Sequence, residues 1–200
     1  MRPLVVKYGG SLLALAPALV PVLLAAPRPV LVVPGGGPFA DAVRRLDPGD
    51  DAAHWMACAA MEQFGLYLAD LGLPAVEELA VPPTPSVLLP YRTLRDLDPL
   101  PHTWEVSSDT IAAWCADRIG ADLLLAKSVD GVVVEGRLVE HLSAPVATDT
   151  VDPCLVRFAL SRSLRVRLVN ARAPGRLALA LAGEPCTGTV IDPRFLEPSA

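Results

Sequence analysis

The first residues that could do chemistry stand at the end of an apolar run near the start of the sequence. Apolar residues 4–6 lead into Lys7, and Gly9, Gly10 and Ser11 follow closely. An unbroken apolar run is typical of a strand buried on both faces, and glycines let the backbone approach a ligand. Ser11 is a favourable cap for a following helix, whose free N–H groups attract anions. A lysine, bare backbone and a helix N-terminus together predict a phosphate site.

A second arrangement of the same kind follows. Residues 29–34 are apolar, three glycines occupy 35–37, and Pro38 is favourable at the start of a helix predicted over 39–46. If the two strands are parallel neighbours, both glycine turns lie at the carboxyl edge of one sheet, where α/β sheets bind ligands. We therefore expect one turn to hold a phosphoryl donor and the other turn to hold its acceptor.

Two polar clusters come later in the chain. Ser107, Ser108 and Asp109 are cap-forming residues ahead of a helix predicted to end at Gly120. A buried strand is predicted over 121–126, and it runs into Lys127. The residues alone leave two roles open for Asp109, a helix cap or a site residue. They likewise leave Lys127 as a solvated strand end or a part of the site.

The remaining elements must position these residues. Helical spacing predicts helices over 12–26 (broken by prolines), 52–71, 153–163 and 174–181. Strands are expected at 86–90, 166–170 and 189–191, with a hairpin over 132–139. We expect the proline-rich stretch 81–101 to be a stiff surface excursion that forms no helix. This alternation predicts an α/β fold, a three-layer α/β/α sandwich with a mainly parallel central sheet.

The composition limits the classes of function. Of 200 residues, 52% are hydrophobic and 20% are charged, which suffices for a large core and argues against disorder. The net charge of −5 gives no support for binding nucleic acid or an anionic membrane. The four cysteines are widely spaced, so we expect reduced thiols and no metal site. Without a signal-like or spanning segment, we expect a cytoplasmic protein.

The motifs occur in a set order along the chain. K-x-G-G-S, G-G-G, S-S-D-x-x-A and K-S-V-D-G are followed by the closing Gly188-Thr189-Val190-Ile191. Neither a Walker motif nor G-x-G-x-x-G occurs. The pattern resembles the amino acid kinase family, which includes acetylglutamate kinase, aspartokinase, uridylate kinase and isopentenyl phosphate kinase. The resemblance implies a single domain over 1–200, with an acceptor-side lobe at about 1–105 and a nucleotide-side lobe at about 106–200.

The resemblance also implies an activity and roles for single residues. It implies an ATP-dependent phosphotransferase that uses Mg²⁺ and forms a homo-oligomer. Lys7 matches the catalytic lysine of the family, and Asp109 matches the aspartate that organises the active-site lysines. The implied ATP-binding residues are Lys7, Gly9, Gly10, Ser11, Lys127, Asp130 and Gly131. The expected acceptor-side residues are Gly35, Gly36, Gly37, Ser108, Arg44 and His102.

The second catalytic lysine that many members of the family carry late in the chain has no clear match. Residues 171–184 offer only Arg172 and Arg176 as cations. The residue that supplies a second cation therefore stays open at this point.

Within the family, the short chain most resembles the small kinases of methanofuran-type cofactor synthesis. These phosphorylate [5-(aminomethyl)furan-3-yl]methyl phosphate to the diphosphate. For the amine of that acceptor the candidate carboxylates are Asp41, Glu62 and Asp109, and for its phosphate the candidate arginines are Arg44 and Arg92. Its ring could lie against one of three tryptophans, Trp55, Trp104 and Trp114, although core packing is expected for at least two of them.

Two alternatives stay open beside this reading. One is another kinase of the family, acting on a nucleoside monophosphate, isopentenyl phosphate or a carboxylate. The other is a non-catalytic member that binds a nucleotide or an oxyanion. The presence of Lys7 and Asp109 together argues against the second alternative.

Overall fold

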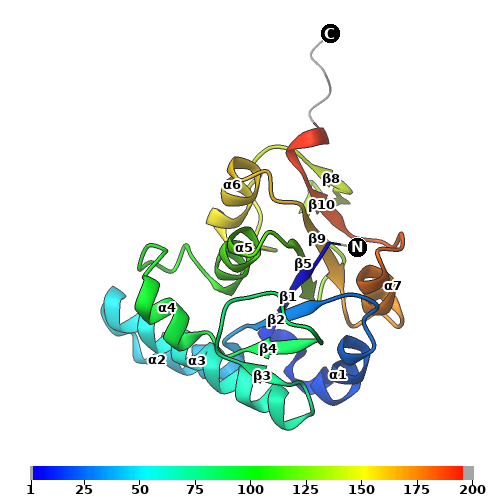
Figure 1. Cartoon of the computed structure of the whole chain (residues 1–200). Helices are drawn as coiled ribbons and strands as arrows, with labels where there is room; N and C mark the ends of the chain where they lie inside the picture. Colours follow the sequence, from blue (N-terminus) through cyan, green and yellow to red (C-terminus); the bar gives the residue numbers. More distant parts are fainter. Residues whose placement is uncertain (1, 196–200) are drawn as a thin grey trace.

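An eight-stranded sheet runs through the computed structural model, which describes residues 2–195 (Figure 1). Its strands lie in the order β3 (Ala75–Val76), β4 (Ser86–Leu88), β2 (Val30–Pro34), β1 (Leu4–Tyr8), β5 (Asp122–Lys127), β9 (Val166–Asn170), β10 (Thr189–Ile191) and β8 (His141–Leu142). Strand β10 runs antiparallel to β9, and the other neighbouring pairs of this sheet are parallel. The predicted α/β fold with a mainly parallel sheet is confirmed.

Apart from α4, the helices follow the predicted pattern. They are α1 (Ala16–Leu24), α2 (Gly37–Leu46), α3 (Asp50–Asp70), α4 (Tyr91–Leu97), α5 (Ser108–Arg118), α6 (Pro153–Ser161) and α7 (Arg176–Ala182), with short 3₁₀ turns at Gly10–Leu15 (η1) and Pro193–Phe195 (η2). A separate hairpin pairs β6 (Val133–Val134) with β7 (Arg137–Leu138), as predicted. Within residues 2–195, no helix has both the length and the apolar character needed to cross a membrane.

The strands bury both of their faces, which explains their unbroken apolar runs. On β1, Val5 belongs to one core cluster, whereas Leu4 and Val6 belong to the other. Helices α5 and α6 cover the first face, and α1 and α7 cover the opposite face (Figure 1). Because side chains alternate along a strand, Lys7 projects to the same face as Val5, toward α5.

Two local predictions were wrong. The proline-rich stretch contains α4, because Pro90 stands at the N-cap and Pro99 lies beyond the C-cap residue Asp98. Proline breaks a helix when it stands in the interior but is tolerated at the ends. The positions of the prolines in this stretch therefore mattered more than how many there are. Ser11 is not a cap, because it lies inside η1, whose N-cap is Gly9.

Candidate active site

The carboxyl ends of β1 and β2 bring the two glycine turns into contact, as predicted. Gly35 N donates a hydrogen bond of 2.8 Å to the carbonyl of Tyr8. A Cβ atom on Gly10 would lie 2.4 Å from the Cα atom of Gly37, so no side chain fits between the turns. Gly37 also has a left-handed φ of 53°, which glycine adopts without strain. The absence of side chains therefore allows the two turns to meet.

Asp109 lies between two lysines that come from neighbouring strands. Lys7 Nζ is 2.9 Å from Asp109 Oδ1, and Lys127 Nζ is 2.5 Å from Asp109 Oδ2. Lys7 is in register with Leu125 on β5, so Lys127, two residues further, projects to the same face. The N-cap of α5 is Ser107, whose side chain accepts a hydrogen bond from Asp109 N. Asp109 is therefore not the cap of α5, and its carboxylate contacts both lysines instead.

The charges of this cluster do not balance. Lys7 and Lys127 are the only lysines of the 200-residue chain, and both contact Asp109, so one positive charge is left over. The Lys7 and Asp109 side chains are only 7% and 3% exposed, so water screens this charge poorly. A bound anion would balance it.

The pKa shifts of the cluster follow from burial and charge together. Burial acts to raise the pKa of Asp109, but the ammonium groups of Lys7 and Lys127 outweigh it and hold this pKa below its usual value. The pKa of Lys127 is lowered, first by burial and then by repulsion from Lys7, although Asp109 opposes the change. Asp109 therefore stays ionised at neutral pH, and its lowered pKa makes it a weak base with little tendency to take up a proton.

Lys127 is a second cation beside Asp109, and the register between β1 and β5 brings it there. Of the two arginines after residue 171, Arg172 donates to the carbonyl of Ser11 at 3.3 Å. A signal was available in the sequence, since both lysines end buried strands.

The other residues expected to bind ATP lie around this pair. Gly9 N donates to the carbonyl of Ala126 at 3.1 Å, which joins the first glycine turn to the end of β5. Ser11 Oγ donates to Ser128 Oγ at 3.1 Å. The two segments that carry the lysines are therefore tied to each other just after β1 and β5.

Asp130 and Gly131 have structural contacts of their own. Asp130 accepts hydrogen bonds from Asn170 at 3.0 Å and from Arg176 at 2.5 Å, and these lower its pKa. Gly131 is buried, and a Cβ atom there would lie 2.5 Å from Thr189 Oγ1. These contacts hold the loop after β5 against β9, α7 and β10.

Asp152, which the sequence analysis did not single out, anchors the N-terminus of α5. Its carboxylate caps α6 by accepting from the N–H groups of Cys154 and Leu155. It also accepts from the backbone and side chains of Ser107 and Thr110, on both sides of Asp109. An aspartate directly before Pro153 is a helix-start signal that could have revealed the cap. Nothing local could have revealed the contacts with α5.

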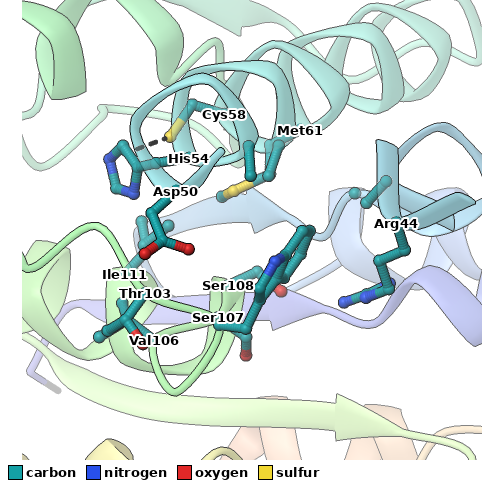
Figure 2. Close-up of a pocket in the computed structure, with 15 residues that line it drawn as sticks. Arg44, Asp50, His54, Cys58, Met61, Thr103, Val106, Ser107, Ser108 and Ile111 are labelled. Atoms are coloured by element: carbon teal, nitrogen blue, oxygen red, sulfur yellow. Dashed lines mark hydrogen bonds between the residues drawn. The ribbon is translucent and has the colours of Figure 1, made fainter. Parts of the chain in front are cut away.

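A pocket of about 580 Å³, counting the solvent at its mouth, opens between α2, α3 and the segment before α5 (Figure 2). Three of the predicted acceptor-side residues line it, namely Gly36, Arg44 and Ser108. Gly35 lies just behind, since a Cβ atom there would be 3.4 Å from Ser108 Oγ. Ser108 directly precedes Asp109, so one lining residue is the chain neighbour of the carboxylate that contacts both lysines.

Only some of the tryptophans and arginines considered for the acceptor lie at the pocket. Trp114 is buried in the core, and Trp55 packs against the same core cluster. Trp104 lines the pocket. The guanidinium of Arg44 lies 5.0 Å from the centre of the Trp104 ring. Arg92 is exposed and pairs with Glu77. Arg44 is therefore the arginine that a ligand in the pocket would meet.

Comparisons with known proteins find a sequence relative and several solved structures that are similar to this chain. No family model matches the sequence. The [5-(aminomethyl)furan-3-yl]methyl phosphate kinase of Methanocaldococcus jannaschii is 26% identical, over 90% of this chain and 93% of that protein. Uridylate kinase from Archaeoglobus fulgidus has a similar structure, with a TM-score of 0.69 at 19% identity over 95% of this chain and 99% of that chain.

Two further solved structures share the fold. UMP kinase from Ureaplasma parvum matches with a TM-score of 0.71 at 17% identity, over 96% of this chain and 100% of that chain. An isopentenyl phosphate kinase matches with a TM-score of 0.61 at 16% identity, over 95% and 100%. This chain therefore shares its fold with uridylate, UMP and isopentenyl phosphate kinases. Its kinase relatives support a small-molecule kinase, that is, a phosphotransferase.

His102, the remaining acceptor-side candidate, is not among the pocket-lining residues within residues 2–195. Its Nδ1 lies 2.6 Å from Asp51 and its Nε2 lies 2.9 Å from Asp98. These two hydrogen bonds raise the pKa of His102. The contacts tie the segment after α4 to α3, which carries one wall of the pocket.

His102 also belongs to a group of three side chains that are of the types that bind metal ions. Ligand atoms of His54, Asp98 and His102 lie within 4.8 Å of one another. However, the two imidazole rings stack with their centres 4.0 Å apart and an angle of 17° between their planes. Nearly parallel stacked rings cannot both direct an in-plane nitrogen at one ion, so this arrangement fits a charged clamp better than a metal centre.

The clamp predicts a pH-dependent contribution to stability. Because the pKa of His102 is raised on folding, its contribution is fully present below about pH 6.5, the usual histidine value, and is lost as the pH rises through the raised value. Asp51 and Asp98 are exposed, so we expect about 1 kcal/mol or less.

The measurement is the difference in free energy of unfolding between wild type and His102→Gln, followed by urea denaturation from mildly acidic to alkaline pH. We expect the difference to shrink with rising pH. A difference that stays constant would mean that the charge of His102 contributes nothing.

Proposed function

We propose that the protein is an ATP-dependent kinase that phosphorylates [5-(aminomethyl)furan-3-yl]methyl phosphate to the diphosphate. The observation that carries the kinase chemistry is the pair of lysines on a single buried carboxylate, beside two touching glycine turns. The acceptor is supported by the relative that is 26% identical over nearly the whole chain and carries this activity in its name.

The proposed reaction is an in-line phosphoryl transfer. A phosphate oxygen of the acceptor forms a bond to the γ-phosphorus of ATP, and the bond from that phosphorus to the β,γ-bridging oxygen breaks, so ADP leaves. A phosphate oxygen is already a nucleophile, so the reaction needs no general base. Catalysis then consists of positioning and of neutralising charge on the transferring group.

The residues of the cluster supply that charge. In the proposal, Lys7 and Lys127 contact oxygens of the transferring phosphoryl group, and Asp109 holds both ammonium groups in place. Their excess positive charge is present before the reaction, so no reorganisation is needed as charge develops. The first glycine turn offers backbone N–H groups to ATP, and the second turn with Ser108 and Arg44 faces the acceptor phosphate.

Mg²⁺ enters the proposal together with the nucleotide. The carboxylates of this region are engaged, because Asp109 contacts two lysines, Asp130 contacts Arg176, and Asp152 accepts six hydrogen bonds. Mg²⁺ commonly keeps several waters and is bound largely by substrate phosphates. Its role is to neutralise charge on the phosphates of ATP.

The test is to incubate the purified protein with Mg-ATP and one acceptor at a time, and to follow the products by phosphorus NMR. The acceptors are the aminomethylfuran phosphate, UMP and isopentenyl phosphate. A new diphosphate ester from the furan alone is the expected result. A diphosphate from another acceptor would keep the kinase chemistry and reject the acceptor, and binding of ATP without any transfer would reject both.

A further inference from the structure

The pocket carries opposite charges on opposite sides. Within the part of the chain that the structure describes, Asp50 is the single carboxylate among its lining residues and Arg44 is the single guanidinium. Figure 2 shows Asp50 beside His54 on one side and Arg44 on the other, with Ser107 and Ser108 between them. A ligand with an anionic and a cationic end would fit this polarity in one orientation only.

Asp50 differs from the other acidic residues considered for an amine. Asp41 pairs with Arg44 at 2.8 Å, Glu62 accepts a hydrogen bond from Tyr91 N at 2.8 Å, and Asp109 holds the lysines. None of these three lines the pocket within residues 2–195. Asp50 lines it, and its carboxylate makes no hydrogen bond or ion pair with another residue in the part of the chain that the structure describes.

The surroundings of Asp50 favour a cation at this end of the pocket. His54 is the nearest basic group along α3, and burial, followed by the charge of His102, lowers its pKa. His54 is therefore neutral at neutral pH and does not compete for the carboxylate. The charge of His102 is held by Asp51 and Asp98. The pocket between the two ends includes Ala53, Ala57, Met61 and Ile111, which suit a flat ring.

We infer that Asp50 binds the primary ammonium group of the acceptor and thereby selects phosphate esters that carry an amine at the far end. This rests on the proposed function, which supplies the phosphate end and the reaction. An aliphatic amine has a pKa near that of lysine, about 10, so it is charged at neutral pH. UMP and isopentenyl phosphate have no cationic group and would gain nothing from Asp50.

The test compares two acceptors in matched enzymes. The first acceptor is the aminomethylfuran phosphate, and the second is the same ester with methyl in place of aminomethyl. A charge-assisted hydrogen bond predicts that wild type prefers the amine by about 10- to 100-fold in kcat/KM. Asp50→Asn keeps the shape and removes the charge, so its preference falls to near one. Asp50→Glu is expected to keep part of the preference.

Asp47→Asn is the matched control. Asp47 is an exposed acid just before α3 and is not a lining residue, and asparagine tolerates its φ of 48°. This variant is expected to keep the wild-type preference. If Asp50→Asn also keeps it, or if wild type shows no preference, the inference is overturned while the kinase and its acceptor stand. If wild type transfers nothing to the furan ester, the proposed function fails and the inference fails with it.

Discussion

Lys7→Met is expected to lower kcat by about 10³-fold, the scale of losing one preorganised group that stabilises charge in the transition state. The variant should nevertheless stay folded. Wild type holds two lysines on one carboxylate, whereas the variant keeps a balanced pair of Lys127 and Asp109. Removing the excess positive charge relieves repulsion in the unliganded protein, so the melting temperature is expected to hold or rise while activity is lost.

The measurements are steady-state kinetics and thermal unfolding without nucleotide. Arg45→Met is the control, because Arg45 is an exposed cation on α2 outside the pocket lining. It should keep normal kinetics. A Lys7→Met enzyme with kcat within about tenfold of wild type would contradict the assigned role of the lysine, since tenfold corresponds to only about 1.4 kcal/mol of barrier.

Asp152→Asn is expected to lower the free energy of unfolding by about 2–4 kcal/mol, because it disrupts a buried carboxylate with six hydrogen bonds. Both oxygens accept, so an amide NH₂ must face donors from Ser107 and Thr110 or from the start of α6. Activity should also fall, since Ser107 and Thr110 flank Asp109 and fix the start of α5.

Urea denaturation measures this effect, with kcat determined under conditions where the variant is fully folded. Asp149→Asn is the matched control, because Asp149 is an exposed acid in the same connection. It should change the stability by less than about 0.5 kcal/mol. An Asp152→Asn protein as stable as this control would show that the six contacts are replaceable.

The residues near each strand end could be predicted from the sequence, because the patterns that indicate them lie within a few neighbouring residues. The apolar runs at 4–6 and 29–34, the glycines that follow and the cap-forming residues before α5 each announce one element and its boundary. Their order along the chain also carried the family resemblance, and with it the roles expected of Lys7 and Asp109.

Other features depend on contacts that no local pattern contains. Whether Lys127 faces solvent or Asp109 depends on the register between β1 and β5. Asp152 reaches α5 only because α6 packs beside it, and Asp50 faces a pocket only because the segment after α4 lies across α3.

The sequence by itself therefore determined the layers of the fold, the two glycine turns and the lysine and aspartate at their edge, because buried strands and tight turns impose period and composition on neighbouring residues. Only the tertiary structure decided which charges meet. Strand register and helix packing bring residues from distant parts of the chain within hydrogen-bond distance, and burial then sets the strength of their interaction.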